Sequence, residues 1–261
     1  MGFNLVILTL IGTFLLILLL LHMWLESRKN KITYTELSFS SLPKQFSGMK
    51  LFFISDIHHR EVNNCILKEI QGNVDLIIIA GDLTEKGVPF SRVEKNIKSL
   101  TKIAPTYFVW GNNDYEVNHF RLESILLNEG VKILANSCTS FKRDSETIDL
   151  IGVDDFGHRF DNLEASTKEC NGDFQILVSH NPDIKKKLRE VHNINLILSG
   201  HTHGGQIRLF GYSISEKAGL SKLKNDLYIL VSNGYGTTRL PLRLGAPAEV
   251  HIITLKNGVV D

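Results

Sequence analysis

The chain has 261 residues and a formal net charge of +1 at pH 7, so its length fits one domain of about 220 residues plus an appendage. The balanced charge, with no basic block beyond a short cluster after the apolar N-terminus, argues against a nucleic-acid partner. The three cysteines are scattered and have no metal-ligand spacing, which argues against a thiolate metal site.

The N-terminus predicts a membrane anchor. Leu5 to Trp24 is a run of 20 residues without a formal charge, and a helix of that length spans about 30 Å, the thickness of a bilayer core. A cleaved signal peptide would need basic residues before the run and small residues after it, and neither is present. We therefore expect an uncleaved single-pass anchor with a basic juxtamembrane segment over residues 1–31, followed by one domain over residues 32–261.

Beyond the anchor, compact apolar runs predict strands and amphipathic runs predict helices. The expected strands are residues 32–39, 50–54, 74–80, 106–110, 131–134, 148–153, 174–178, 195–198, 228–232 and 250–255. The expected helices are residues 63–71, 90–102, 120–129 and 183–191. Because strands alternate with helices, the sequence indicates an α/β fold.

Polar residues follow five of the buried strands directly. They are Asp56 with His58, Asp82, Asn112, His180, and His201 with His203. Folds of this class bind ligands at the carboxyl ends of their strands, so we expect these side chains to meet. The pair His201 and His203 is a weak signal alone, but the glycines after it allow a loop that turns both imidazoles inward.

Two Asp, one Asn and four His form a donor set that suits Mn, Fe, Zn or Co. Seven ligands are too many for one ion with an open position, and they fit two ions that share a carboxylate. Each residue also has a structural interpretation, since Asp56 and Asp82 could cap helices and His180 could begin a turn. All seven being structural is far less plausible than a metal site.

The segments Asp56-Ile57-His58, Gly81-Asp82, Gly111-Asn112-Asn113-Asp114, Ser179-His180 and Gly200-His201-Thr202-His203 resemble, in order and spacing, the five signature blocks of the calcineurin-like metallophosphoesterases. The resemblance covers about Leu51 to Leu255 and implies a four-layer α/β/β/α sandwich. Gly204-Gly205-Gln206 and the segment from Arg239 to Arg243 are similar to a membrane-associated bacterial branch, which includes YkuE-like phosphoesterases and UDP-2,3-diacylglucosamine pyrophosphatases.

The resemblance implies a metal-dependent phosphohydrolase, of enzyme class 3.1 or 3.6, with two divalent ions, of which Mn is favoured over Fe, Zn and Co. A metal-bridging hydroxide would attack phosphorus. One ion would be held by Asp56, His58, Asp82 and His203, and the other by Asp82, Asn112, His180 and His201. Asp82 would bridge the two ions.

Asn113 departs from the family pattern, which usually has a histidine after the ligand asparagine. Asn113 can donate a hydrogen bond but cannot supply a proton near pH 7, so we expect substrates with good leaving groups or another acid. Asp114, which would orient that histidine, is retained. Arg208, Arg239 and Arg243 are candidate phosphate clamps, with plain surface arginines as the alternative.

The sequence therefore favours a phosphoesterase that acts on a phosphorylated small molecule or, because of the anchor, on a lipid-linked phosphate or pyrophosphate. One alternative is a phosphodiesterase or nuclease acting on soluble nucleotides, and the absence of a basic block argues against nuclease use. The other alternative is a catalytically weak metal-binding scaffold, which the asparagine at position 113 keeps open.

The side of the membrane follows from the flanking charges. Arg28, Lys29 and Lys31 follow the apolar run and no Lys or Arg precedes it, so the positive-inside rule places the domain in the cytoplasm. Protease added to intact cells should leave the domain uncut, while protease added to lysed cells should digest it. Digestion in intact cells would contradict this orientation.

Overall fold

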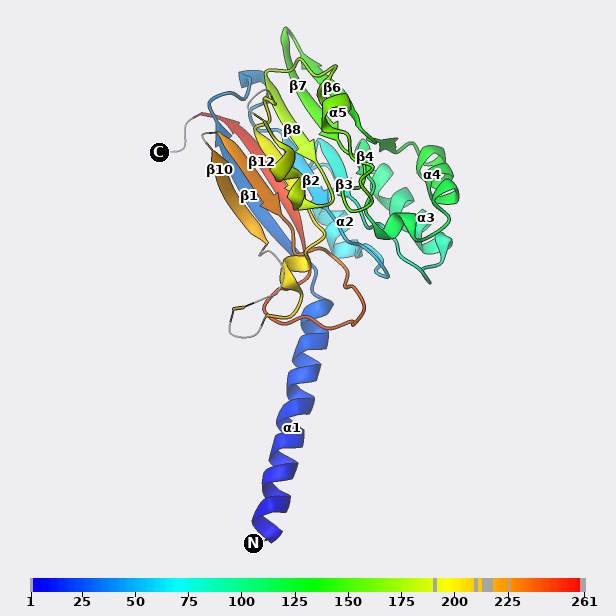
Figure 1. Cartoon of the computed structure of the whole chain (residues 1–261), viewed down its shortest axis with the longest axis vertical. Helices are drawn as coiled ribbons and strands as arrows, with labels where there is room; N and C mark the ends of the chain where they lie inside the picture. The colour runs from blue at the N-terminus through cyan, green and yellow to red at the C-terminus, as the bar shows by residue number, and fades with distance from the viewer. Residues whose placement is uncertain (1, 190–191, 209–210, 213–217, 225, 259–261) are drawn as a thin grey trace.

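The computed structural model describes residues 2–189, 192–208, 211–212, 218–224 and 226–258. Two stacked six-stranded sheets form the centre of the domain, and one long helix projects from it (Figure 1). In spatial order the first sheet contains β1 (Lys31–Phe39), β12 (Glu249–Asn257), β2 (Lys50–Ile54), β3 (Leu76–Ala80), β4 (Thr106–Val109) and β5 (Lys132–Ile133). The second sheet contains β10 (Gly219–Lys224), β11 (Leu227–Val231), β9 (Leu196–Ser199), β8 (Phe174–Val178), β7 (Glu146–Gly152) and β6 (Ser137–Arg143).

The two sheets pack face to face through apolar side chains. Phe53 of β2 and Ile78 of β3 belong to the same buried cluster as Ile176 of β8 and Leu198 of β9. The central strands β2, β3, β8 and β9 are almost fully buried because both of their faces are covered. This explains why the sequence shows them as continuous apolar runs rather than as alternating ones.

Helices cover both outer faces. The first sheet carries α2 (Asn64–Ile70), α3 (Phe90–Thr101) and α4 (His119–Asn128), and the second carries α5 (Leu163–Thr167) and the 3₁₀ turn η3 (Pro182–Lys187). Helix α3 buries Val93, Ile97 and Leu100 against the sheet, which is the spacing of an amphipathic helix. The predicted four-layer α/β/β/α sandwich is confirmed, with a thin fourth layer.

Some elements differ from the sequence-based expectation. The helix expected over residues 183–191 is the 3₁₀ turn η3, which ends at Lys187, and residues 190–191 lie outside the described residues. Strands β6 and β10 and helix α5 were not expected. Most residues of β6 and β10 are partly or fully exposed because both strands lie at sheet edges, so neither shows an apolar run.

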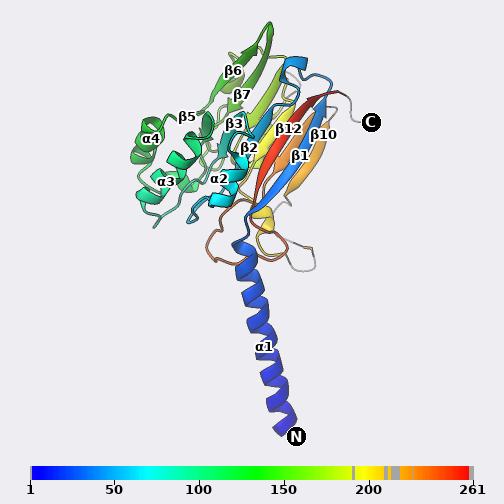
Figure 2. The ribbon, with the colours of Figure 1, turned by 180° about the vertical axis from the view of Figure 1, so that it is seen from behind.

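Strand direction places the polar residues at one edge. Strands β2, β3 and β4 run parallel in the first sheet, and β7, β8, β9 and β11 run parallel in the second. Strand β12 is antiparallel to β2, and β1 is parallel to β12, so β1 begins at the edge where β2 ends. The polar ends of the central strands and the entry point of the chain from α1 therefore share one end of the domain (Figures 1 and 2).

Helix α1 (Gly2–Ser27) meets the domain at that same end (Figure 2). Its segment Phe3–Ser27 contains a stretch of 18 residues with a mean hydropathy of 2.8 and is long and apolar enough to cross a membrane. Its last turn contacts the loop between β11 and β12, where Met23, Glu26 and Ser27 are buried. The span candidate and the ligand-rich edge are thus adjacent.

Candidate metal centre

The loops that carry the predicted ligands turn sharply as they leave their strands. Asp56, His58, Asp82, His201 and His203 all have positive φ angles, between 50° and 68°. For residues other than glycine this conformation costs roughly 1–2 kcal/mol each. Such strain concentrated in three neighbouring loops indicates that the positions of these side chains matter for function.

Glycines allow these loops to approach one another. A Cβ at Gly81 would lie 2.7 Å from the ring of His180, and a Cβ at Gly200 would overlap the carboxylate of Asp56. The backbone also links the loops, since the N–H of Asp56 donates to the carbonyl of Gly81 at 3.0 Å. Because glycine has no side chain, Gly81 and Gly200 allow the carboxylates and imidazoles of both sheets to come together.

Six of the predicted ligands form two clusters, in each of which the candidate ligand atoms lie within 4.8 Å of one another. The clusters are Asp56, His58 and His203, and Asp82, His180 and His201. In the first, His203 Nε2 lies 3.2 Å from His58 Nε2 and 3.3 Å from Asp56 Oδ1. In the second, His180 Nε2 lies 3.2 Å from Asp82 Oδ2 and 3.3 Å from His201 Nδ1.

Asp82 and Asn112 complete the arrangement. The Oδ2 atom of Asp82 also lies 3.8 Å from His58 Nε2, so this carboxylate faces both clusters. The side-chain oxygen of Asn112 is buried and has no hydrogen-bond partner. A buried acceptor without a donor is unfavourable unless a cation or water satisfies it, so the residues present fit a pair of divalent cations.

Partners outside the clusters orient three of the imidazoles. His180 Nδ1 donates to the carbonyl of Ala80 at 2.8 Å, which leaves Nε2 free to bind a metal. His58 Nδ1 lies 2.9 Å from Glu85 Oε2, an ion-pair contact that leaves its Nε2 facing the first cluster. His203 differs, because its Nδ1 lies 3.1 Å from a guanidinium nitrogen of Arg243.

The sequence reading missed Glu85, which holds His58 with one oxygen and lies 2.6 Å from His59 Nε2 with the other. Glu85 follows Asp82 by three residues. In the sequence, however, a glutamate in a polar loop cannot be distinguished from an ordinary surface residue. The pKa of His58 is raised overall. Burial by itself would lower this pKa, but the interaction with Glu85 and the negative charge of Asp82 have a larger, opposite effect.

The other titratable groups of the site respond to burial and to each other. Burial lowers the pKa of His203 to about 3, so this ligand is neutral at pH 7. Burial and the charge of Asp82 raise the pKa of Asp114 to about 7. Burial would also raise the pKa of Asp82, but the charge of His180 and its hydrogen bond lower it overall.

The two residues proposed as catalytic support the ligand loops. Asn113 donates to both oxygens of Asp82, from Nδ2 at 2.6 Å and from its backbone N–H at 2.9 Å. Asp114 is fully buried and accepts hydrogen bonds from the backbone N–H groups of Thr84 and Gly111. Asn113 lines the open cavity and Asp114 lies beneath it.

The three candidate arginines occupy different environments. Arg239 is exposed and lines the cavity. Arg208 is half-buried and donates to the carbonyl of Gly204 and to Asn233 Oδ1. Arg243 is fully buried and its donors point at backbone carbonyls, so the expectation that it contacts substrate must be corrected: a guanidinium without exposed surface cannot reach a phosphate.

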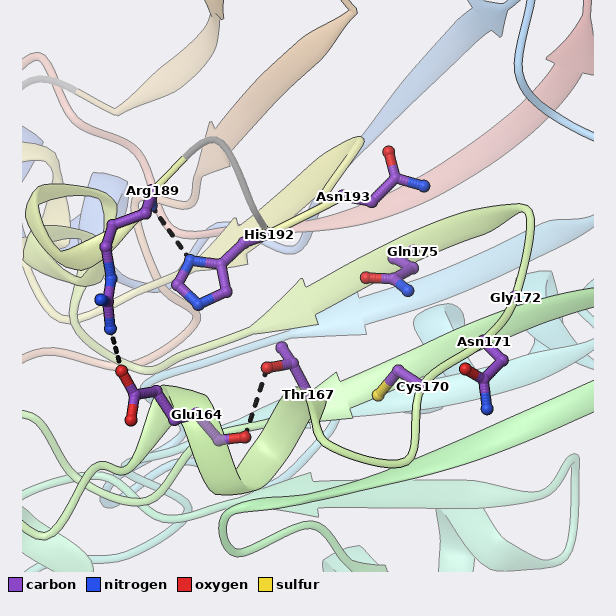
Figure 3. Close-up of a pocket in the computed structure, with 9 residues that line it drawn as sticks. All are labelled: Glu164, Thr167, Cys170, Asn171, Gly172, Gln175, Arg189, His192 and Asn193. Atoms are coloured by element: carbon purple, nitrogen blue, oxygen red, sulfur yellow. Dashed lines mark hydrogen bonds and ion pairs between the residues drawn. The ribbon is translucent and has the colours of Figure 1, made fainter.

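A cavity of about 600 Å³ opens onto the ligands, and it is lined by Asp82, Asn112, His201 and His203. Lys86 and Arg239 add positive charge to its wall. A second cavity, of about 510 Å³, includes Glu164, Cys170 and His192 in its lining, together with none of the predicted ligands (Figure 3). The first cavity is therefore the candidate substrate site, because the predicted ligands line it and not the second cavity.

Comparison with known proteins identifies relatives of this site. The sequence profile of the calcineurin-like phosphoesterases matches residues 49–205, which confirms the resemblance noted from the five segments. The chain is 47% identical over 210 residues to the uncharacterized protein YpbG of Bacillus subtilis, covering 79% of this chain and 81% of YpbG. It is 28% identical over 253 residues to the uncharacterized metallophosphoesterase YkuE of the same organism, covering 90% of this chain and 88% of YkuE.

A transmembrane protein with metallophosphoesterase domain from Bos taurus is 31% identical over 255 residues, and the match covers 86% of this chain but 57% of that protein. Among solved structures, the NAD nucleotidase of Haemophilus influenzae has a TM-score of 0.53 at 16% identity, covering 72% of this chain and 45% of that one. At that identity the likeness concerns the fold alone.

Glu85 provides a test of how the site is held. Glu85→Ala should weaken metal binding about 10- to 100-fold, because His58 loses the partner that orients it. Glu116→Ala is the matched control, since Glu116 lines the same cavity and contacts no ligand that the structure describes. Manganese affinity measured by calorimetry would decide, and equal losses in the two variants would contradict the role of Glu85.

Proposed function

Because this chain belongs to the calcineurin-like phosphoesterase family, we propose that it hydrolyses a phosphate ester or pyrophosphate bond with two divalent cations. The observation that carries the proposal is the pair of clusters that the carboxylate of Asp82 faces, together with the unpartnered oxygen of Asn112, which lines the same cavity. A buried amide oxygen without a donor, next to carboxylates and imidazoles that gather at one edge of the sheets, is satisfied when cations bind between them.

In this proposal the seven side chains divide as the family resemblance implies. One cation is held by Asp56, His58, Asp82 and His203, and the other by Asp82, Asn112, His180 and His201. Two cations, when bound, supply a nucleophile from water at neutral pH and neutralise charge on phosphoryl oxygens. Manganese is our first choice because the ligands are oxygen and imidazole.

The remaining side chains of the cavity bind and orient. Asn113 fixes both oxygens of Asp82, so that this carboxylate presents one orientation to both clusters. Lys86 and Arg239 line the same cavity and offer donors to phosphate oxygens of the substrate. Neither Asn113 nor the buried Asp114 is available to protonate a leaving group, which favours a phosphoanhydride or another good leaving group.

We further propose that residues 1–31 anchor the domain of residues 32–261 to the cytoplasmic side of a membrane, and that the substrate is presented there. The loop between β11 and β12 supports this, because it both lines the cavity and contacts the last turn of α1. Leu240 in this loop is 57% exposed and precedes Pro241, whose carbonyl accepts a hydrogen bond from Ser27 at the end of α1. A lipid-linked phosphate or pyrophosphate is the substrate class that such a position favours.

A substrate panel tests the proposal. The full chain in lipid nanodiscs with Mn²⁺ should hydrolyse nucleotide-sugar or lipid-linked pyrophosphates faster than p-nitrophenyl phosphate or its bis-ester. Asp82→Asn should lower every rate by at least about 100-fold, since it removes the carboxylate that faces both clusters. Metal binding without hydrolysis of any of these compounds would favour the scaffold alternative, and preference for the bis-ester would favour a phosphodiesterase.

Asn113 gives a separate prediction. Asn113→His should raise turnover of an alkyl phosphomonoester, a poor leaving group, about 10-fold or more, because imidazole donates a proton near pH 7. The gain should be small for p-nitrophenyl phosphate, whose leaving group needs no proton. Asn113→Gln controls for the change in size, and no gain for the alkyl ester would contradict this reading.

A further inference from the structure

Arg243 is a buried cation held almost entirely by backbone oxygen atoms. Its donors reach the carbonyls of Ala246 at 2.8 Å, Asn233 at 2.7 Å and Gly236 at 2.6 Å. No carboxylate lies within 4.0 Å of it among the described residues. Burying a guanidinium without a carboxylate partner destabilises the fold more than burying apolar side chains in the same place. The presence of Arg243 at this position therefore indicates a specific role.

The guanidinium contacts one metal ligand directly. Its nitrogens lie 3.1 Å from His203 Nδ1 and 3.3 Å from the carbonyl oxygen of the same residue. His203 has a φ of 50°, a strained conformation that the surrounding structure must maintain. Contacts to both the ring and the backbone fix the position of this imidazole.

The same guanidinium supports the loop beside a second ligand. The segment Asn233–Gly236 offers three carbonyls to Arg243, and its own N–H groups bond back to the β2 loop. The N–H of Tyr235 donates to the carbonyl of Ser55 at 2.9 Å, and that of Gly236 donates to the carbonyl of Asp56 at 2.5 Å. Arg243 therefore supports Asp56 and His203, both in the first cluster.

On its other side the same segment is joined to α1. The backbone N–H of Arg243 donates to the carbonyl of Met23 at 3.0 Å, and the N–H of Gly245 donates to Glu26 Oε2 at 3.0 Å. The hydroxyl of Ser27 donates to the carbonyl of Pro241 at 2.9 Å. The loop between β11 and β12 thus curves around the end of α1 in Figure 1 and connects it to the ligands.

We propose that Arg243 is a positioning residue of the metal centre, and that the last turn of α1 supports the first cluster through it. The second cluster, Asp82, His180 and His201, shares no hydrogen bond or ion pair with Arg243 among the described residues. Loss of the guanidinium or undocking of α1 therefore weakens one metal site and spares the other. The inference rests on the proposed metal centre but not on any substrate.

The test is manganese binding to the full chain in nanodiscs, followed by electron paramagnetic resonance as free Mn²⁺ disappears. Wild-type protein should bind two ions. Arg243→Lys keeps the charge but gathers its donors on one nitrogen, which cannot span the same carbonyls. It should weaken one site about 10- to 100-fold and change the other little, with cooperative melting retained.

Glu26→Ala removes the acceptor of the Gly245 N–H and so tests the link to α1 while the Arg243 side chain and its hydrogen bonds are kept. This variant tests the inference even where Arg243→Lys does not fold. It should weaken the same site by a smaller factor. Glu36→Ala on β1, which removes an exposed glutamate, is the matched control and should bind as wild type does.

Equal weakening of both sites, or Glu26→Ala binding like the control, would overturn the inference. Wild-type protein that binds no manganese would instead overturn the proposed metal centre, so the two failures are distinguishable.

Discussion

The constraint on which this structure depends is the burial of two carboxylates and three imidazoles, with a fourth imidazole half-buried beside them, at one edge of two sheets. Asp56 and Asp82 have almost no exposed surface, and their neighbours are imidazoles whose lone pairs face the same space. Without cations such a group is costly, because buried acceptors need donors and like groups repel. The positive φ angles and the glycines of the loops are the local consequences of forcing these side chains together.

Three of the imidazoles are held by three chemically different partners. His180 bonds to a neutral carbonyl, His58 to the carboxylate of Glu85, and His203 contacts the guanidinium of Arg243. A carboxylate increases the basicity of the ring that it holds, whereas a guanidinium beside a ring disfavours its protonated form. The two imidazoles of the first cluster thus experience opposite electrostatic surroundings although their Nε2 atoms lie 3.2 Å apart.

The position of α1 follows from strand direction. Since β1 is parallel to β12 and β12 is antiparallel to β2, a chain that enters through β1 must enter at the edge where β2 delivers Asp56. A helix at that entry point therefore lies next to the cavity of the predicted ligands as a direct consequence of strand direction. The loop between β11 and β12 connects the two, because it both contacts the end of α1 and lines the cavity.

The sequence by itself determined the elements whose signal is local. Continuous apolar runs identified the central strands β2, β3, β8 and β9, and the residues after them, such as Asp82 and His180, were recognisable as candidate ligands because they follow strand ends. Only the tertiary structure decided the roles of Arg243 and Glu85 and revealed the edge strands β6 and β10. The physical reason is that a run or a spacing is a property of neighbouring residues, whereas the burial of a guanidinium depends on packing between segments far apart, here residues 23–27, 201–205 and 233–246.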